Sequence, residues 1–433
     1  MMSGTNLSSA ARDAILASVE ATFDAQLAFT MDLVRFPSMR GNEAPVQDFL
    51  HAELSRRGYA MDRWRVRAED ISHHPGFSPI AVSYEQAWCV VGTHRPREEK
   101  GRSLILNSHI DVVPPGPVDM WADHPFDPKI RDGWLYGRGG ADMKAGTAIN
   151  VFAMDAIRAA GFQPAATVHV ESVMDEESTG NGALSSLLRG YRAAAWFCPE
   201  PTHETVTRAN AGVVWFKIEV RGRPAHTREM QSGFNAIDAA YRIVGALREL
   251  EARYNAERAD HPLFADDPHP INLNLGQIRG GDWTSMVPAW CEVELRFAMY
   301  PGVSADKVRR DVESCVAAAA ARDPALANNP PAVTWHGFFC EGFELKPGSE
   351  AEIALNAAGM AANSRPIEGQ IMPAYLDARV PMLYGGMPAL VYGPVSREVH
   401  GIDERCDVES IRRCTRTLAL FIADWCGLEP IER

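Results

Sequence analysis

The stretch SLILNSHID, residues 103–111, decides the fold class of this chain. Its central apolar run is typical of a strand that is buried on both faces. Residues 145–160 follow with a helical pattern that stops at Gly161, and a second apolar run covers residues 168–173. The order strand, helix, strand predicts a doubly wound α/β layer.

The pattern changes after about residue 209. Four strands are expected at residues 213–220, 271–278, 289–299 and 332–337, with two helices that begin after the capping residues Asn235 and Ser304. This βαββαβ order is typical of a ferredoxin-like domain. We therefore expect one domain, formed by residues 1–209 and 341–433, to be interrupted by an insert at 210–340. Residues 323–331 (DPALANNPP) are expected to form a loop.

Composition excludes several classes of protein. The 433 residues are 46% hydrophobic and 23% charged, which is ordinary usage for a folded chain of one or two domains. We find no apolar run of the ~20 residues that a membrane helix needs and no signal peptide. The net charge of -13 argues against a nucleic-acid partner. Eight scattered cysteines without a C-x-x-C pair indicate free thiols and a cytoplasmic protein.

Two motifs flank the predicted strand and helix. His109 and Asp111 fall on the same side of the strand, so the Asp111 carboxylate is expected to hold the imidazole in the tautomer that binds a metal. Taken alone, a histidine at a strand end is more often structural. The second motif, GRGGADMKAG at residues 137–146, brings Asp142 to the start of the helix. It lacks the spacing of both phosphate-binding loops, so phosphate binding is excluded.

Three more motifs carry chemistry-bearing residues: DEE at 175–177, CPEP at 198–201 and HGIDE at 400–404. Each one alone is compatible with an ordinary polar loop. Two adjacent carboxylates, here Glu176 and Glu177, can also divide the work at a metal site. One would then bind the ion while the other takes a proton from bound water.

Together these five motifs, in this order and interrupted by the βαββαβ insert, resemble the M20 metallopeptidase family. That family includes acetylornithine deacetylases, succinyl-diaminopimelate desuccinylases, aminoacylases and glutamate carboxypeptidases. The resemblance spans nearly the whole chain. It implies a zinc-peptidase-like catalytic domain with a mixed, mainly parallel sheet and an inserted ferredoxin-like domain that serves as a lid and for dimerisation.

The resemblance also implies a site for two divalent metal ions. The expected ligands are the bridging residue Asp142, His109 and Glu200 on one ion, and Glu177 and His400 on the other. Glu176 would be the general base, which takes a proton from the shared water and returns it to the leaving amine. A cis peptide bond is implied between Asp142 and Met143. Mixed histidine and carboxylate ligands suit zinc, with cobalt or manganese as alternatives.

Catalytic and substrate-binding residues follow from the same resemblance. His226, within GRPAH at 222–226, matches a histidine that stabilises the tetrahedral oxyanion, often across a dimer interface. A homodimer formed through the insert is therefore expected. Arg296, Asp377 and Arg379 match positions that hold a substrate carboxylate, a task that suits the planar fork of arginine.

Two segments depart from the family pattern where substrate would sit. SMVP at 285–288 replaces the frequent Asn-Val-Val-Pro, and AYL at 374–376 replaces Gly-Gly-Thr. The expected activity is removal of an acyl group from an N-acyl amino acid or a related small amide. Alternatives are a dipeptidase or carboxypeptidase, and a deformylase or hydrolytic deaminase of an aromatic or heterocyclic amine. A non-catalytic binding protein is least favoured, because every ligand and the base are present.

Overall fold

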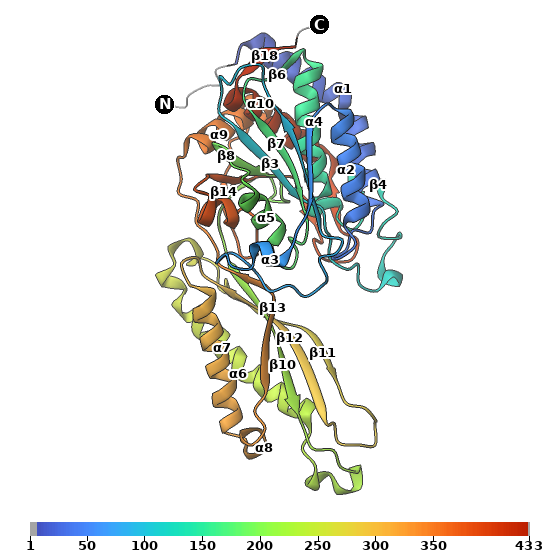
Figure 1. The fold of residues 1–433 in the computed structure, drawn as a ribbon, viewed down its shortest axis with the longest axis vertical. Coiled ribbons are helices and arrows are strands. Elements are labelled where there is room, and N and C mark those ends of the chain that lie inside the picture. The colour runs from blue at the N-terminus through green and yellow to red at the C-terminus, as the bar shows by residue number, and fades with distance from the viewer. Residues whose placement is uncertain (1–6, 432–433) are drawn as a thin grey trace.

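The computed structural model describes residues 7–431, which form two units (Figure 1). The larger unit holds both ends of the described chain and contains a six-stranded sheet between helices. The insert unit, residues 212–340, projects from it as a four-stranded sheet with two long helices on one face. None of the described helices is both long and apolar enough to span a membrane.

The sheet of the larger unit is mixed. Its strands lie in the order β1 (Ala60–Arg65), β2 (Trp88–His94), β7 (Val168–Val173), β3 (Leu104–His109), β8 (Ala195–Cys198) and β15 (Ala389–Val391). The last four are mutually parallel, whereas β1 and β2 add an antiparallel edge. The prediction of a mixed, mainly parallel sheet is confirmed.

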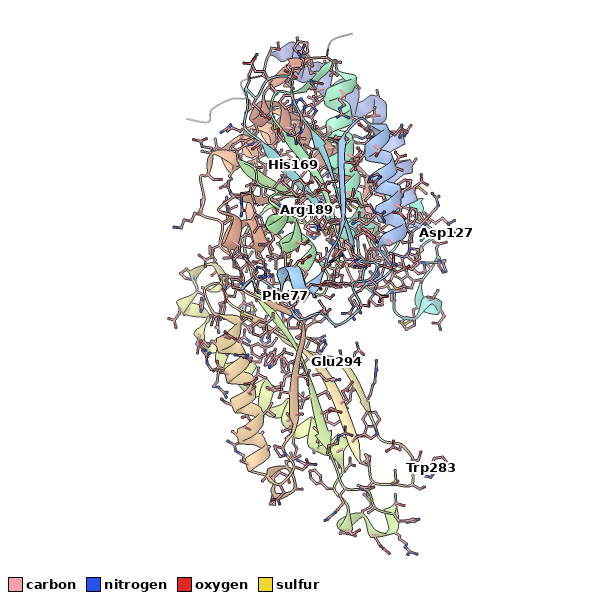
Figure 2. The ribbon with its side chains drawn as sticks, viewed as in Figure 1. Phe77, Asp127, His169, Arg189, Trp283 and Glu294 are labelled. Atoms are coloured by element: carbon pink, nitrogen blue, oxygen red, sulfur yellow. The ribbon has the colours of Figure 1, made fainter. Side chains whose placement is uncertain are left out.

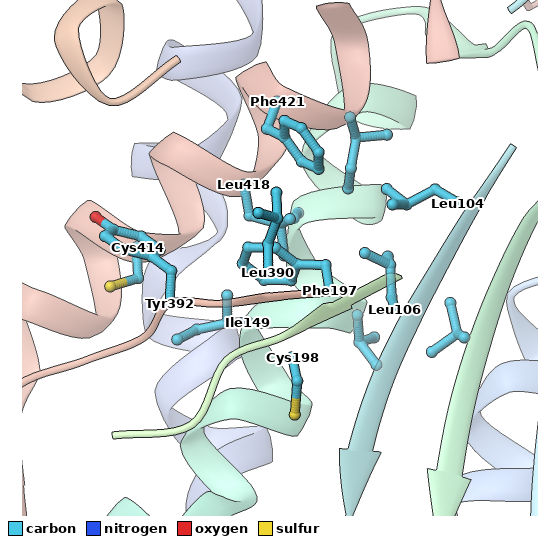
Figure 3. Close-up of a cluster of buried hydrophobic side chains, with 14 of the residues drawn as sticks. Leu104, Leu106, Ile149, Phe197, Cys198, Leu390, Tyr392, Cys414, Leu418 and Phe421 are labelled. Atoms are coloured by element: carbon cyan, nitrogen blue, oxygen red, sulfur yellow. The ribbon is translucent and has the colours of Figure 1, made fainter. Parts of the chain in front are cut away.

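Helices cover this sheet on both faces. They are α1 (Ser9–Val34), α2 (Ala44–Arg56), α3 (Ala68–Ile71), α4 (Ala145–Ala159), α5 (Asn181–Arg189), α9 (Glu350–Asn363) and α10 (Val408–Cys426). Helix α4 is buried along almost its whole length between the sheet, α1 and α10. Figure 3 shows Ile149 of α4 in the apolar cluster formed by Leu106, Phe197 and Leu418. This rigid core supports the strand ends at which the predicted ligands lie.

Short strands tie loops to the larger unit. One small sheet contains β4 (Lys129–Arg131), β5 (Trp134–Tyr136), β17 (Arg405–Asp407) and β16 (Ser396–Arg397). Two further pairs are β9 (Val206–Asn210) with β14 (Gly369–Met372), and β6 (Phe162–Pro164) with β18 (Leu428–Pro430). The pairing of β17 with β5 places the chain after His400 beside the chain before Asp142.

The insert unit has the predicted element order. It runs β10 (Gly212–Arg221), α6 (Ala236–Ala256), β11 (Leu273–Gly280), β12 (Trp290–Met299), α7 (Ala305–Ala321) and β13 (Ala332–Cys340). The antiparallel sheet has the order β11-β12-β10-β13. Asn235 and Ser304 cap the two helices as expected, because each side chain accepts a backbone N–H of the first turn.

One expectation for the insert was wrong. The segment at 323–331 contains a helical turn, α8 (Pro324–Ala327), rather than only a loop. The Asp323 side chain accepts the backbone N–H of Ala325, and Pro324 occupies the first helical position, where its missing N–H costs nothing.

Candidate metal centre

Three parallel strands of the larger unit bring polar residues to one edge of the sheet. Strand β3 ends at His109, β7 leads into Glu176 and Glu177, and Glu200 follows β8. Because the strands are parallel, these carboxyl ends meet on the same side. Asp142 joins them from the turn before α4, and His400 joins them from the loop before β17.

Asp142 lies at the centre of this group. Its Oδ1 is 3.1 Å from Nε2 of His109, which is also 3.6 Å from Oε1 of Glu200. Its Oδ2 is 3.3 Å from Nε2 of His400, which is 3.0 Å from Oε2 of Glu177. The two carboxylate oxygens of Asp142 therefore face two separate pairs of side chains. Ligand atoms of His109, Asp142 and Glu177 all lie within 4.8 Å of one another.

The turn that carries Asp142 is closely packed. The Asp142–Met143 peptide bond is cis, as the resemblance implied. Gly139 has φ 77°, in the region that favours glycine, and a Cβ there would lie 2.4 Å from Val112. Glycine in this turn therefore allows a left-handed backbone conformation and close packing against the neighbouring side chains.

Asp111 contacts this group differently from what its sequence position suggested. Nδ1 of His109 lies 3.0 Å from the backbone carbonyl oxygen of Asp111 and 3.7 Å from the nearest carboxylate oxygen. A carbonyl oxygen only accepts, so Nδ1 carries a proton and Nε2 faces Asp142. The Asp111 carboxylate instead accepts the backbone N–H groups of Glu176, at 3.1 Å, and Glu177, at 3.0 Å. It positions the loop that holds both glutamates.

The group concentrates acidic side chains in a buried place. Burial, reinforced by neighbouring carboxylates, raises the pKa of Glu176 and of Glu200 well above the usual range. The charge of Glu177 raises the pKa of His400 to about 11. Buried carboxylates in excess over cationic groups are costly unless positive charge joins them. Two imidazoles and three carboxylates around one space form a donor set that fits divalent metal ions.

Asp377 and Arg379 lie in the wall beside the acidic group. The Asp377 carboxylate accepts the Tyr375 hydroxyl at 2.8 Å, and burial raises its pKa to about 6. Arg379 is fully buried, and its Nη2 donates to the carbonyl oxygen of Gly76 at 2.6 Å. Arg379 therefore links this wall to the loop of Gly76, and its role in holding a substrate carboxylate stays a prediction.

Arg296 lies in the insert unit and has no carboxylate partner among residues 7–431. It donates to Oδ1 of Asn272, and burial lowers its pKa to about 10. Its register partner Trp215 lies beside it on the face of the sheet opposite α6. The structure does not join Arg296 to the acidic group.

His226 is exposed and lies far along the insert. It forms an isolated bridge with Met286, in the same loops as Trp283, which Figure 2 shows at the end remote from the larger unit. Its Nδ1 accepts the backbone N–H of Arg228 at 3.1 Å. Within one chain, the described structure does not bring His226 to the acidic group, and its action across a dimer stays a prediction.

Buried charged residues near the centre that the sequence did not single out include Glu43, Arg138 and Glu404. Arg138 and Glu404 stand inside the motifs that contain Asp142 and His400. Opposite charges inside two ligand motifs were a signal that could have identified this pair. Glu43 has no comparable signal, because it lies in a separate N-terminal segment. Burial and the Asp111 charge raise its pKa to about 8.

Comparisons with known proteins agree with this geometry. Residues 105–424 match the model of peptidase family M20/M25/M40. The chain is 27% identical to an N-formyl-4-amino-5-aminomethyl-2-methylpyrimidine deformylase of Halalkalibacterium halodurans, over 96% of this chain and 97% of that protein. It is also 27% identical to a succinyl-diaminopimelate desuccinylase of Xanthomonas campestris pv. campestris, over 90% and 97%.

Solved structures show the same fold at lower identity. The dipeptidase Dug1p of Saccharomyces cerevisiae superposes with a TM-score of 0.76 at 15% identity, covering 97% of this chain and 99% of that one. A dinuclear metal-binding M20 peptidase of Bacillus subtilis has a TM-score of 0.57 at 15% identity, covering 93% and 98%. With the family match covering most of the sequence, the chain belongs to peptidase family M20/M25/M40, whose members are hydrolases that act on amide bonds.

Proposed function

We propose that this protein is a dinuclear metal-dependent amidohydrolase that removes an acyl group from an N-acyl amino acid or a related small amide. The observation that carries the proposal is the position of Asp142, whose two oxygens face His109 and His400 on opposite sides. Glu200 and Glu177 complete the two halves. Zinc is the proposed metal, with cobalt or manganese as alternatives.

The side chains then have distinct tasks. Two bound ions would act as Lewis acids and make a shared water acidic enough to give up a proton near neutral pH. Glu176 takes that proton on its carboxylate and returns it to the leaving nitrogen. Asp111 fixes the base by accepting the Glu176 N–H.

The insert unit is proposed to be a ferredoxin-like lid that also forms a homodimer. Its strand order and its two helices on one face support the fold assignment. Met230 and Trp283, which are 56% and 74% exposed, line a hollow of about 510 Å³ beside Thr227. Exposed apolar side chains of this size are typical of interaction surfaces. Arg296 remains the proposed partner of a substrate carboxylate after closure.

A second candidate, deformylation of an aromatic or heterocyclic amine, is favoured by one feature. A Cβ at Gly337 would lie 2.5 Å from the Trp215 indole and 3.2 Å from the carbonyl oxygen of Ser178, so glycine at this position leaves room for the indole close to the loop that follows Glu177. Nε1 of Trp215 and Nε2 of His336 are buried without hydrogen-bond partners among the described residues. Flat ring systems suit such a wall. The relative named as a pyrimidine deformylase supports the same candidate.

One experiment separates these activities. Protein stripped with a chelator and reloaded with Zn²⁺, Co²⁺ or Mn²⁺ is assayed with N-acetyl, N-succinyl and N-formyl amines and with dipeptides. We expect no hydrolysis without metal, and hydrolysis of one acyl class after reloading. Equal activity with and without metal would contradict the proposal. The eight free cysteines support a cytoplasmic location, which fractionation of cells would test.

A further inference from the structure

Glu404 holds the turn that carries Asp142. Its Oε1 accepts the backbone N–H groups of Ala141, at 2.9 Å, and of Asp142 itself, at 3.1 Å. Its Oε2 accepts the N–H of Gly139 at 3.2 Å. The backbone carbonyl oxygen of Glu404 also accepts the N–H of Gly137 at 3.0 Å. The Glu404 side chain thus accepts three of the backbone N–H groups in the turn at residues 139–142, which lies outside its own sequence motif.

Arg138 connects the same turn to two other segments. Its Nη1 lies 2.5 Å from Oε2 of Glu404, and both side chains are only 1% exposed. Its Nη2 donates to the carbonyl oxygen of Gly401, at 3.0 Å, and approaches that of Pro114, at 3.5 Å. Gly401 follows His400, and Pro114 follows the strand end that bears His109 and Asp111. The guanidinium therefore reaches all three segments.

We infer that Arg138 and Glu404 are positioning residues that hold His400 and the Asp142 turn at the separation a second metal ion requires. The inference rests on the proposed dinuclear centre. His109 stands at the end of β3 inside the core sheet and is held independently of this pair. His400 lies on a loop, has a side chain that is 50% exposed and has φ 62°. The His400 half of the site therefore depends most on outside support.

The chemistry of each residue suits this task. A guanidinium presents several donors in a rigid plane, so Arg138 can bind Glu404 and two carbonyl oxygens at once, whereas a lysine ammonium lacks that planar reach. A carboxylate offers only acceptors, so Glu404 can receive three N–H groups and a guanidinium. A glutamine would turn donor hydrogens toward at least one of these donors. Trp121 flanks the guanidinium, at 5.2 Å between Cζ and the ring centre.

Two substitutions test the inference through metal binding and not through activity. Metal-free wild type, Arg138→Lys and Glu404→Gln are titrated with Co²⁺, and absorption and heat are followed for each ion bound. We expect wild type to bind two ions. Arg138→Lys should bind the first ion normally and the second at least tenfold more weakly, with an altered Co²⁺ absorption band. Glu404→Gln should weaken both ions, because Asp142 contacts both halves.

Arg208→Lys is the matched control, since Arg208 pairs with the buried Glu352 elsewhere in the larger unit. Arg208→Lys should bind both ions as tightly as wild type, although its melting temperature should fall by about as much as that of the two test variants. Tight binding of two ions by Arg138→Lys would overturn the inference. So would losses of metal affinity in all three variants that simply follow their melting temperatures. A wild type that binds fewer than two ions would instead contradict the proposed function, which separates the two failures. If Glu404→Gln does not fold, Arg138→Lys alone decides.

Discussion

The carboxylate of Asp111 accepts the backbone N–H of Glu176 at 3.1 Å. The same residue accepts Nδ1–H of His109 through its backbone carbonyl oxygen. One aspartate therefore fixes a proposed metal ligand with its main chain and the proposed base with its side chain.

This arrangement predicts a selective effect of Asp111→Asn. The backbone contact to His109 survives, but the amide nitrogen of asparagine cannot accept an N–H from Glu176 or Glu177. We expect both metal ions to bind, kcat to fall about 10- to 100-fold and KM to change little. Metal analysis and steady-state kinetics check this. Asp62→Asn, which alters a surface pair with Arg189, is the control. An unchanged kcat would remove Asp111 from the positioning role.

Mixing two inactive variants tests whether His226 acts across a dimer. Glu176→Ala and His226→Ala chains, unfolded together and refolded in equal amounts, should form about one half mixed dimers. Each mixed dimer would contain one complete site, so activity should return to about one quarter of wild type. Light scattering should show a dimer. No recovery despite mixed dimers would mean that His226 acts within its own chain, and full activity of His226→Ala alone would mean that it has no catalytic role.

Arg379 should contribute more to stability than to substrate affinity. It is fully buried and bonded to the carbonyl oxygen of Gly76, so Arg379→Met would leave that acceptor unpaired at a cost of about 1 to 3 kcal/mol. We expect a lower urea midpoint, with KM for a carboxylate-bearing substrate changed less than threefold. Exposed Arg365→Met is the control. A large rise in KM at unchanged stability would instead support the substrate-binding role expected from sequence.

Acid should destabilise the protein through His169. Burial lowers the pKa of His169 to about 4. The Arg95 charge acts in the same direction, and the Glu99 charge opposes it. The Thr93 hydroxyl forms a hydrogen bond with Nδ1 of His169. In the unfolded chain this histidine takes up a proton near pH 6.5. The neutral, folded His169 therefore contributes its full stabilisation above pH 6.5, and this stabilisation is lost as pH falls toward 4. Relative to His169→Gln, wild type should lose about 2 to 3 kcal/mol over that range.

Chemical unfolding at several pH values measures this difference. His73→Gln, at an exposed histidine of the same unit, should follow wild type. Parallel pH profiles for wild type and His169→Gln would contradict the assignment.

Local patterns were sufficient to predict most elements. The run at 168–173 became β7 with the same bounds, and Asn235 and Ser304 cap helices as expected. The Asp142–Met143 cis bond came from the family resemblance and not from spacing.

What the sequence did not reveal depends on contacts between distant segments. Side-chain alternation placed Asp111 beside His109, but it cannot tell a carbonyl contact from a carboxylate contact. The link between Arg138 and Glu404 joins two motifs far apart in the chain, and only the pairing of β17 with β5 brings them together. Arg379 donates to the carbonyl oxygen of Gly76, which belongs to a loop without a recognisable motif.

The most direct test of the central claim is the metal content and amide hydrolysis of Glu176→Gln, measured beside wild type and the exposed control Glu350→Gln. If Glu176 is a base that does not bind metal, the variant should retain two ions per chain and lose turnover by at least about 100-fold. Retained turnover, or loss of an ion together with activity, would contradict a centre in which Asp142 bridges the metals and Glu176 moves the proton.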